Sequence, residues 1–192
     1  MGGGGSSPLP YDAEVEYIQG GIFDTSFVPK STGVHTWEYM FINKVNYAYC
    51  FCTKPVESGT WMVFAGWNNN TAKSEILYGS SSTFGWNAAN NTKYSGEMDM
   101  SGQTKTLKIG GSRQLSLSAN SFTNTYPFSF QLSKNDTITN RLYWYKIVED
   151  GILKLDIIPV RIGSVGYLYD KVGGELISNS DTVTPVIGSD KN

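Results

Sequence analysis

The chain has few charged side chains, one histidine and no long apolar run, and each scarcity argues against a class of protein. Charged residues make up 17% of the 192 residues, the net charge is −2 and no long basic run occurs. The chain therefore lacks the basic surface that binds the phosphate backbone of a nucleic acid. No stretch of about 20 apolar residues is present, so we predict no helical membrane span. We expect neither nucleic acid nor a membrane as a partner.

The single imidazole and the two cysteines limit the possible chemistry. His35 has Gly33 and Thr36 as neighbours, which supply no nucleophile for a catalytic triad, and we expect it at a turn or strand edge. Cys50 and Cys52 stand at i and i+2, where the Cα atoms of a strand lie about 6.5–7 Å apart, at the edge of disulfide reach. We expect two buried free thiols. A metal site is not predicted, because the chain has only one histidine and no second pair of cysteines to complete a set of ligands.

The first ten residues differ in composition from the rest. Residues 1–10 are MGGGGSSPLP, in which Gly and Ser make a flexible coil and the prolines stiffen its end. A flexible tail or cloning linker is one interpretation, and an arm that attaches the protein within an assembly is the other. No basic segment followed by an apolar one occurs here, so we expect synthesis in a cytoplasm. The chain divides into an arm, 1–10, and one domain, 11–192.

From Tyr11 onward, short apolar segments alternate with polar turns. Aromatic residues reach 14%, with 12 Tyr and 5 Trp, which favours strands, and no segment keeps a helical period for ten residues. Asp150-Gly151 between two strand-like segments predicts a hairpin. Strands are expected near 14–18, 34–42, 45–53, 60–67, 74–79, 82–88, 95–100, 104–109, 113–118, 125–132, 141–149, 152–160, 165–169 and 174–177. This pattern predicts an all-β sandwich or barrel.

The last third of the chain resembles a known family. The segments that carry the resemblance are Arg141-Leu142-Tyr143-Trp144-Tyr145-Lys146-Ile147, Asp156-Ile157-Ile158-Pro159-Val160-Arg161 and Gly166 to Leu176, preceded by Glu16-Tyr17-Ile18 and Asp24-Thr25. They resemble a laminin-G-like family that is abundant in bacteriophage genomes and in prophages of gut bacteria. The match is clear over about 141–176 and partial over 13–25. The resemblance implies a concanavalin A-like, two-sheet antiparallel jelly-roll sandwich, usually carried on virion or surface-associated proteins.

Several residues of the matching segment have structural explanations. Arg141 and Asp156 are placed to pair across the hairpin, and Asp170 is placed to cap a turn. Pro159 suits a strand end or a sheet edge. The resemblance implies neither a fixed ligand nor a catalytic set, since one fold hosts many functions.

Two carboxylates on one predicted strand are the strongest indication of an enzyme, a glycoside hydrolase. Glu97 and Asp99 alternate onto one face of a strand, as in glycoside hydrolases of this fold that carry E-x-D-x-x-E. The third carboxylate is missing, because Ser101-Gly102-Gln103 follows. The two-carboxylate mechanism is then incomplete, so we expect an acidic strand end and no enzyme.

Sugar binding needs an aromatic ring beside groups that hydrogen-bond hydroxyls. Two tryptophans stand next to asparagine clusters at predicted strand ends, which gives these candidate glycan-binding residues: Trp67, Asn68, Asn69, Trp86, Asn87 and Asn90. The alternative is that both tryptophans belong to the core and the asparagines form ordinary turns. No cofactor is predicted, and a structural calcium stays open.

Three functions are compatible with these features. The leading one is a non-enzymatic bacteriophage virion component, in the head decoration, a fibre or the tail, attached to other virion proteins through the arm and displaying a lectin-like domain to host or mucosal glycans. The alternative is a standalone lectin module on the surface of a gut bacterium. A glycoside hydrolase is third. A homo-oligomer is compatible with each of them.

Overall fold

The structure is a computed structural model that describes residues 9–45, 48–53, 62–68, 73–78 and 81–192. Within 48–49, 62–68, 73–77 and 81–86 the description is limited to the backbone. No helix occurs in these residues, and their strands form two large antiparallel sheets and one small hairpin. The predicted all-β, two-sheet sandwich is confirmed. A helix of the length and apolarity needed to cross a membrane is accordingly absent from the described residues.

The larger sheet contains eleven of the described strands. Their bounds are β1 Ala13–Glu14, β2 Ile18–Gln19, β4 Val34–Phe41, β9 Lys93–Asp99, β10 Thr104–Ile109, β11 Ser112–Ser118, β15 Asn140–Glu149, β16 Ile152–Ile162, β17 Val165–Asp170, β18 Glu175–Ile177 and β19 Val186–Ile187. The order is β11-β10-β9-β4-β15-β16-β17-β18, with β1 on β16, β2 on β15 and β19 on β2. Strands β4 and β15 therefore lie near its middle.

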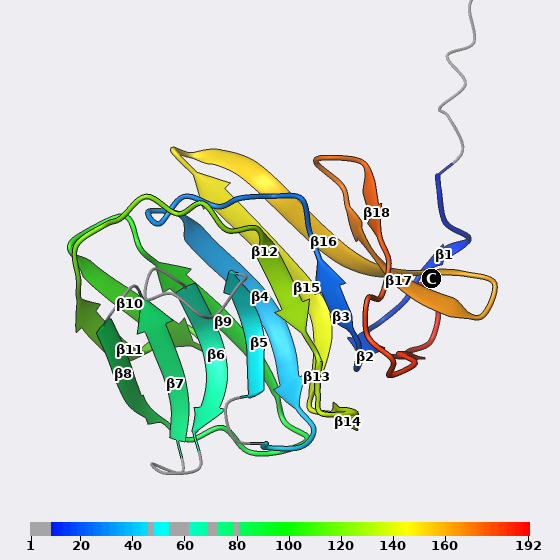
Figure 1. Cartoon of the computed structure of the whole chain (residues 1–192), viewed down its shortest axis with the longest axis horizontal. Coiled ribbons are helices and arrows are strands. Elements are labelled where there is room, and N and C mark those ends of the chain that lie inside the picture. Colours follow the sequence, from blue (N-terminus) through cyan, green and yellow to red (C-terminus); the bar gives the residue numbers. More distant parts are fainter. Residues whose placement is uncertain (1–8, 46–47, 54–61, 69–72, 79–80) are drawn as a thin grey trace, which may run out of the picture.

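The smaller sheet lies against the larger one. Its strands are β3 Ile22–Asp24, β5 Ala48–Thr53, β6 Met62–Asn68, β7 Lys73–Tyr78, β8 Ser81–Trp86 and β12 Phe128–Gln131, in the order β3-β12-β5-β6-β7-β8, and the small hairpin pairs β13 Ser133–Lys134 with β14 Thr137–Ile138. Figure 1 shows β6, β7 and β8 on the same side of the molecule as β10 and β11, with β17 and β18 on the opposite side. This end of the smaller sheet therefore lies on the side of β10 and β11, away from β17 and β18.

The core is centred on β4 and β15, where alternation along the strand separates an inner from an outer face. In β4 the side chains of His35, Trp37, Tyr39 and Phe41 are buried, and those between them are half-buried. The Tyr145 ring lies 5.8 Å from Trp37, at an interplanar angle of 10°, and 4.7 Å from Phe51 of the opposite sheet. Burial of such rings is the main apolar stabilisation of a sandwich.

The prediction that His35 lies at a turn or strand edge was wrong. Its place in the period-2 pattern puts it on the same face as Trp37, inside the central strand β4. There its Nδ1 lies 2.8 Å from the hydroxyl of Tyr145. Burial lowers the pKa of His35 to about 3, since the charged imidazolium is disfavoured away from water.

The hairpin between β15 and β16 forms as predicted. Asp150 and Gly151 have φ angles of 52° and 76°, and they connect Glu149 to its partner Ile152. Positive φ at both central residues is the type I′ turn that Asp-Gly favours. Further along β16, Pro159 lies where the neighbouring strand changes from β15 to β1, so it sits inside the strand rather than at its end.

Two expectations for the matching segment have different outcomes. Asp170 caps a turn, because its carboxylate accepts hydrogen bonds from the backbone N–H groups of Val172 and Gly173 at 3.0 and 2.9 Å. The pairing of Arg141 with Asp156 does not occur. Arg141 bonds the side-chain oxygen of Gln19, on the strand beside it, and Asp156 instead pairs with Lys146 at 3.3 Å.

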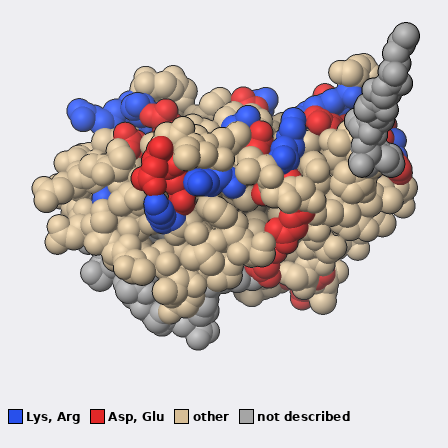
Figure 2. Space-filling view, turned by 90° about the horizontal axis from the view of Figure 1, so that it is seen from above, with Lys and Arg blue, Asp and Glu red and all other residues tan. Residues whose placement is uncertain are grey.

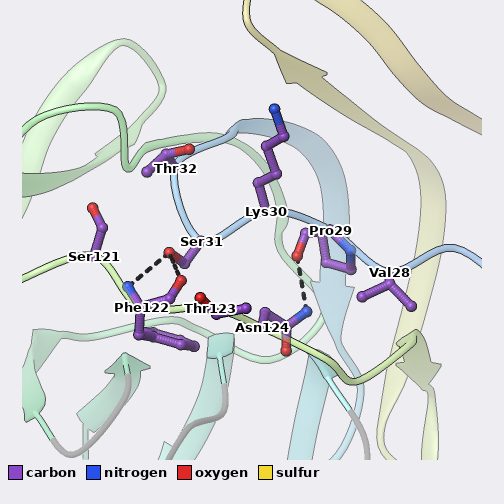
Figure 3. Close-up of a pocket in the computed structure, with 9 residues that line it drawn as sticks. All are labelled: Val28, Pro29, Lys30, Ser31, Thr32, Ser121, Phe122, Thr123 and Asn124. Carbon is purple, nitrogen blue, oxygen red and sulfur yellow. Dashed lines mark hydrogen bonds between the residues drawn. The ribbon is translucent and has the colours of Figure 1, made fainter.

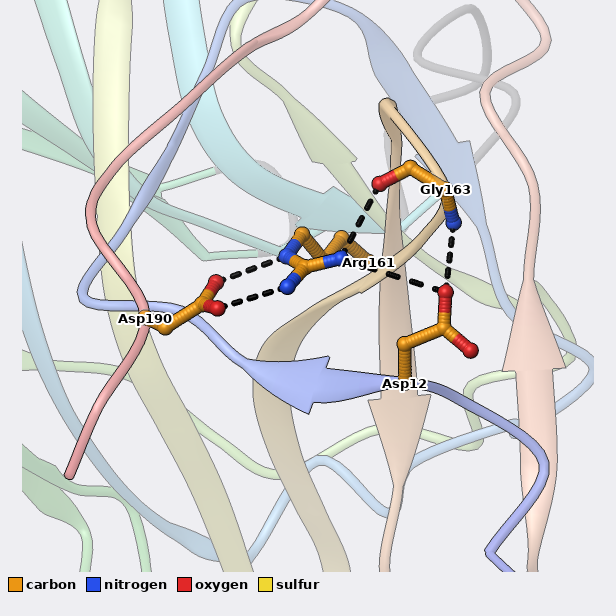
Figure 4. Close-up of polar contacts among 4 residues, drawn as sticks. All are labelled: Asp12, Arg161, Gly163 and Asp190. Carbon is orange, nitrogen blue, oxygen red and sulfur yellow. Dashed lines mark hydrogen bonds and ion pairs between the residues drawn. The ribbon is translucent and has the colours of Figure 1, made fainter.

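The two ends of the described chain meet on β16. The Arg161 guanidinium donates two hydrogen bonds of 2.6 Å to the Asp190 carboxylate and lies 3.9 Å from Asp12 (Figure 4). Asp12 in turn accepts a bond from the N–H of Gly163. A bidentate pair of this kind fixes geometry as well as contributing energy. One side chain therefore ties both ends of the described chain to the β16–β17 hairpin.

Candidate functional site

A β-bulge in β15 places two consecutive aromatic side chains on the outer face of the larger sheet. The register between β15 and β4 shifts between Leu142 and Trp144, so that Tyr143 is the extra residue. Tyr143 and Trp144 are both half-buried, whereas Leu142 and Tyr145 on either side are fully buried. A bulge changes the direction in which a strand presents its side chains. Here it interrupts the alternation and exposes part of an indole.

A hollow of about 240 Å³ lies on one side of Trp144. Its lining comes from strands β4, β9, β10 and β15 and from the turn after β10. It consists of Thr36, Trp37, Ser95, Gly96, Glu97, Lys108, Gly111 and Trp144. Within the described residues the hydroxyl of Thr36 has no hydrogen-bond partner. The Lys108 ammonium donates a bond of 2.5 Å to Glu97, which raises the pKa of Lys108 above its ordinary value.

A second hollow, of about 330 Å³, lies on the other side of Trp144. It is lined by Glu16, Glu38, Lys93, Tyr143, Trp144 and Lys191. Glu38 pairs with Lys93 at 2.8 Å, and the same ammonium group lies 4.6 Å from the centre of the Tyr143 ring. Arg141 lies 3.8 Å from the centre of the Tyr17 ring in the same region. Aromatic and charged groups thus alternate along this face.

Trp144 is common to both hollows. Its side chain forms no hydrogen bond, ion pair or ring contact with the part of the chain that the structure describes. Most other large aromatic side chains, such as Trp37 and Tyr145, pack ring to ring inside the core. An indole without such contacts, between two hollows that charged side chains help to line, is suited to contact something outside the chain.

The face around Trp144 carries no excess of one charge sign. The lining of the two hollows includes three carboxylates, Glu16, Glu38 and Glu97, and three ammonium groups, Lys93, Lys108 and Lys191. Elsewhere on the molecule the pattern is similar: seen from above, Lys and Arg lie among Asp and Glu over the described residues of that face (Figure 2). Phosphate-backbone binding, which needs a continuous basic surface, gains no support from this distribution.

The residues expected to bind glycans lie elsewhere. Trp67 and Asn68 end β6 and Trp86 ends β8, with their side chains outside the described part, and Asn69 is itself outside it. The register aligns Trp67 with Ser74, and Ser74 with Trp86, so the backbones of the two tryptophans lie in one row, two strands apart. Asn87 and Asn90 are exposed, and Asn90 forms a backbone bridge with Phe41. Glycan binding by this set stays a prediction.

Glu97 and Asp99, the two carboxylates that suggested a glycoside hydrolase, both have partners in the structure. Asp99 accepts hydrogen bonds from the N–H and the hydroxyl of Ser101 at 2.9 and 2.6 Å, which lower the pKa of the Asp99 carboxyl. Glu97 is held by Lys108. Glu38, on the same face of the neighbouring strand β4, is held by Lys93. Hydrolysis of a glycosidic bond requires two carboxyl groups that face it, and Glu97 and Glu38 are each held in an ion pair.

A third hollow, of about 460 Å³, is larger, but the two loops that line it are hydrogen-bonded to each other. It lies between residues 28–32 and 121–124 (Figure 3). The Ser31 hydroxyl donates to the carbonyl of Phe122 and accepts from its N–H, and the Asn124 amide donates to the carbonyl of Pro29 at 2.8 Å. These bonds join the two loops to each other. The hollow is therefore a loop junction, and the face around Trp144 is the better candidate site.

Groups suited to a metal ion do not gather in the described residues. No cluster of three or more His, Cys, Asp or Glu side chains is placed there to hold a metal ion. Cys50 and Cys52 are both buried free thiols, as predicted, and burial raises the pKa of Cys50 further above that of an exposed thiol. A structural calcium stays an untested expectation.

Trp144 is a site residue that the sequence pattern did not indicate. It lies in the segment that matches the laminin-G-like family, whose residues have structural explanations, so no functional role was considered for it. One signal was available: Leu142, Tyr143, Trp144 and Tyr145 form an unbroken apolar run, and period-2 alternation cannot bury all four. Such a run on one strand of a hairpin predicts either a doubly buried strand or a bulge.

Comparisons with known proteins add little to this geometry. No protein-family model matches the chain, and no curated protein matches it. Among solved structures, the chain is similar to the carbohydrate-binding module CBM66 from Bacillus subtilis, with a TM-score of 0.36 and 10% sequence identity. The similarity covers 64% of this chain and 78% of the module. At this level the comparison does not indicate a ligand, and the site rests on its own geometry.

Proposed function

We propose that the outer face of the larger sheet binds a carbohydrate, with the indole of Trp144 as the surface on which a sugar ring stacks. The observation that carries this proposal is the position of Trp144: a bulge presents it, it forms no hydrogen bond, ion pair or ring contact within the described residues, and a hollow lies on either side. Aromatic rings accept the apolar face of a pyranose, since the C–H groups of the sugar are the hydrophobic part of its surface.

The polar groups around the indole match the other half of a sugar. Hydroxyl groups both donate and accept hydrogen bonds, and the hollows offer carboxylates as acceptors and ammonium groups as donors. Thr36 adds a hydroxyl that has no partner in the described chain. Apart from Glu16 and Lys191, these groups stand on strands of one sheet, whose hydrogen bonds fix their spacing before a ligand arrives. Preformed spacing reduces the entropy lost on binding.

We propose that this binding is not accompanied by catalysis. Glu97 and Glu38, the carboxylates nearest to Trp144 on β9 and β4, each have a lysine partner at 2.5 and 2.8 Å. A glycoside hydrolase needs two carboxyl groups available to the scissile bond. Incubation of the protein with the glycans that it binds, followed by mass spectrometry, should recover them intact. Release of shorter products by the purified protein would overturn this part of the proposal.

The experiment that tests binding is a glycan array with matched variants. Wild type, Trp144→Phe and Trp144→Ala are applied at equal concentration, and hits are followed by isothermal titration. Trp144→Ala should weaken binding at least ten-fold, which corresponds to about 1.4 kcal/mol, and Trp144→Phe should weaken it less because a ring remains. Ile152→Ala, which truncates an exposed side chain on the β15–β16 hairpin, is the control and should bind as wild type.

Each variant is checked by its far-UV circular dichroism and melting temperature before binding is compared. If the wild-type protein binds a glycan equally well with and without Trp144, the site is elsewhere and the proposal fails. The residues Trp67 and Trp86, from the sequence prediction, are then tested in the same way.

We further propose that the domain is carried on a bacteriophage particle, attached to other virion proteins through residues 1–10. What supports this is the resemblance over about 141–176 and the distinct composition of the first ten residues, of which 1–8 lie outside the described part. Mass spectrometry of purified particles should then detect the protein. Its recovery only from the surface of uninfected bacterial cells would favour the standalone lectin instead.

A further inference from the structure

The spacing and the charges of the groups beside Trp144 indicate which class of carbohydrate fits there, if the proposed function holds. Three rows of residues cross the outer face at right angles to the strands. Lys108, Glu97 and Thr36 form one row, Ser95, Glu38 and Trp144 form the next, and Lys93 and Met40 belong to the third. The row of Trp144 therefore lies between the row of the Glu97–Lys108 pair and the row of Lys93, whose ion-pair partner Glu38 stands in the Trp144 row.

The two outer rows are too far apart for one sugar ring. Thr36 and Met40 are separated by four residues along β4, which places their rows about 13 Å apart at the rise of a β-strand. A single pyranose is shorter than this span. A monosaccharide can occupy the hollow beside Glu97 or the hollow beside Lys93, whereas only a chain of linked sugars reaches both while it stacks on the indole between them.

The charges of the two hollows also select among ligands. In each hollow a carboxylate and an ammonium group form a close pair, Glu97 with Lys108 at 2.5 Å and Glu38 with Lys93 at 2.8 Å. The remaining charged members, Glu16 and Lys191, are one of each sign. An anionic sugar can pair with one of these lysines only if it displaces the glutamate that the lysine already holds. The displaced glutamate then repels the sugar, because both are negatively charged. A neutral sugar keeps both pairs intact.

An intact ion pair also offers a specific hydrogen-bonding pattern. The carboxylate has lone pairs that its lysine does not use, and the ammonium group has further N–H donors. Two adjacent hydroxyl groups of a sugar can therefore bond the pair together, one donating to the carboxylate and one accepting from the ammonium. Each hollow contains one such pair, and Trp144 lies between them.

We infer that the face around Trp144 binds a linear, neutral oligosaccharide of at least two sugar units, with vicinal hydroxyls of separate units on the Glu97–Lys108 and Glu38–Lys93 pairs. Acidic glycans such as uronates, sialosides and sulfated chains are disfavoured by the same pairs.

The test is a titration series in which chain length and charge vary separately. The neutral probes are glucose, N-acetylglucosamine and mannose with their β-1,4-linked di-, tri- and tetrasaccharides. The anionic probes are galacturonic acid oligomers and hyaluronan and heparin tetrasaccharides. The expected result is at least ten-fold tighter binding of some neutral tri- or tetrasaccharide than of its monosaccharide, and at least ten-fold weaker binding of every anionic tetramer. Affinity for the neutral probe should change less than two-fold between 50 and 500 mM NaCl, since no net charge is neutralised.

Isosteric variants connect the selectivity to the two pairs. Glu97→Gln and Glu38→Gln keep the shape of the side chain but free the lysine beside it. Each should weaken the neutral tetrasaccharide several-fold and improve binding of an anionic one. Lys154→Gln, a substitution on β16 away from both hollows, is the matched control and should change neither.

The possible outcomes separate this inference from the proposed function. Binding that depends on Trp144 but is equal for monomer and tetramer, or stronger for an acidic chain, overturns the inference and leaves carbohydrate binding in place. No binding that depends on Trp144, for any probe, overturns the proposed function and the inference with it.

Discussion

Gly96 on β9 leaves the space that the indole of Trp37 occupies on β4. The two residues are partners in the register, and a Cβ atom built on Gly96 would lie 2.6 Å from both Cε2 and Nε1 of Trp37. Trp37 is fully buried and stacks on Tyr145, so its ring has no room to move away. A small residue at this point is therefore a requirement of the core beneath the Trp144 face.

Gly96→Ala should destabilise the protein. The added methyl group forces the Trp37 ring out of its position, and overpacking of this kind costs about 1–3 kcal/mol. Chemical denaturation monitored by tryptophan fluorescence measures the change. Gly102→Ala is the matched control, because the nearest atom to its Cβ is a backbone oxygen at 3.8 Å, and we expect a change within about 0.5 kcal/mol. Equal stability of the two variants would show that the core adapts to the extra carbon.

The stability of the fold should depend on pH through His35. Its pKa is about 3 in the folded protein, compared with about 6.5 in an unfolded chain. Between these values the unfolded state binds a proton that the folded state does not. The contribution is therefore complete above pH 6.5 and is lost as the pH falls towards 3, by up to about 1.4 kcal/mol per pH unit.

Two measurements check this prediction. Urea denaturation of wild type and His35→Phe between pH 4 and 7 should give a steeper loss of stability for wild type, and the difference in slope isolates the imidazole from the carboxylates. Since the chain has one histidine, its ring signals in an NMR spectrum are also unambiguous. They should not titrate between pH 8 and 5 in the folded protein. A midpoint near 6.5 would place the ring in contact with solvent.

The two thiols should be unreactive until the protein unfolds. Cys50 and Cys52 are both buried, and burial raises the pKa of Cys50, which lowers the fraction of reactive thiolate. A colorimetric thiol reagent should label neither residue in the native protein within minutes and both in guanidinium chloride. Cys52→Ser serves to separate the two residues. Rapid native labelling of either would mean that β5 opens readily.

Arg161 should keep both ends of the described chain ordered together. In Arg161→Ala the bonds to Asp190 and Asp12 are lost, and the amides that join residues 12–16 to 188–191 should exchange with deuterium several-fold faster. Lys30→Ala, which removes an exposed ion pair with Asp150 at another hairpin, should leave these amides unchanged. Unaltered exchange in the Arg161 variant would indicate that backbone pairing alone holds the ends.

Much of the fold was predictable because alternation on single strands is a local property. The segment from Val34 to Phe41 and the Asp150-Gly151 turn carry their own structural signals, and both formed as predicted. The order of strands in a sheet depends on contacts between distant residues. The placement of β4 between β9 and β15, which buries His35, could not be derived from the neighbours of His35.

The site was harder to predict for the same reason. The pairs Glu97–Lys108 and Glu38–Lys93 each join residues of two strands, and the bulge at Tyr143 is a property of the register between β15 and β4. The asparagine-flanked tryptophans drew attention because the pattern is local. Trp144 has no such neighbours in the sequence, and its polar surroundings come from other strands.

The most direct test of the account is an NMR titration that follows the tryptophan indole N–H groups. The chain has five tryptophans, so five signals are expected, and the Trp144→Phe variant assigns the one that matters. Addition of the neutral tetrasaccharide that binds most tightly should shift the Trp144 signal most, with the buried Trp37 signal nearly unchanged. Shifts confined to Trp67 or Trp86, with Trp144 unmoved at saturating ligand, would contradict the assignment of the site.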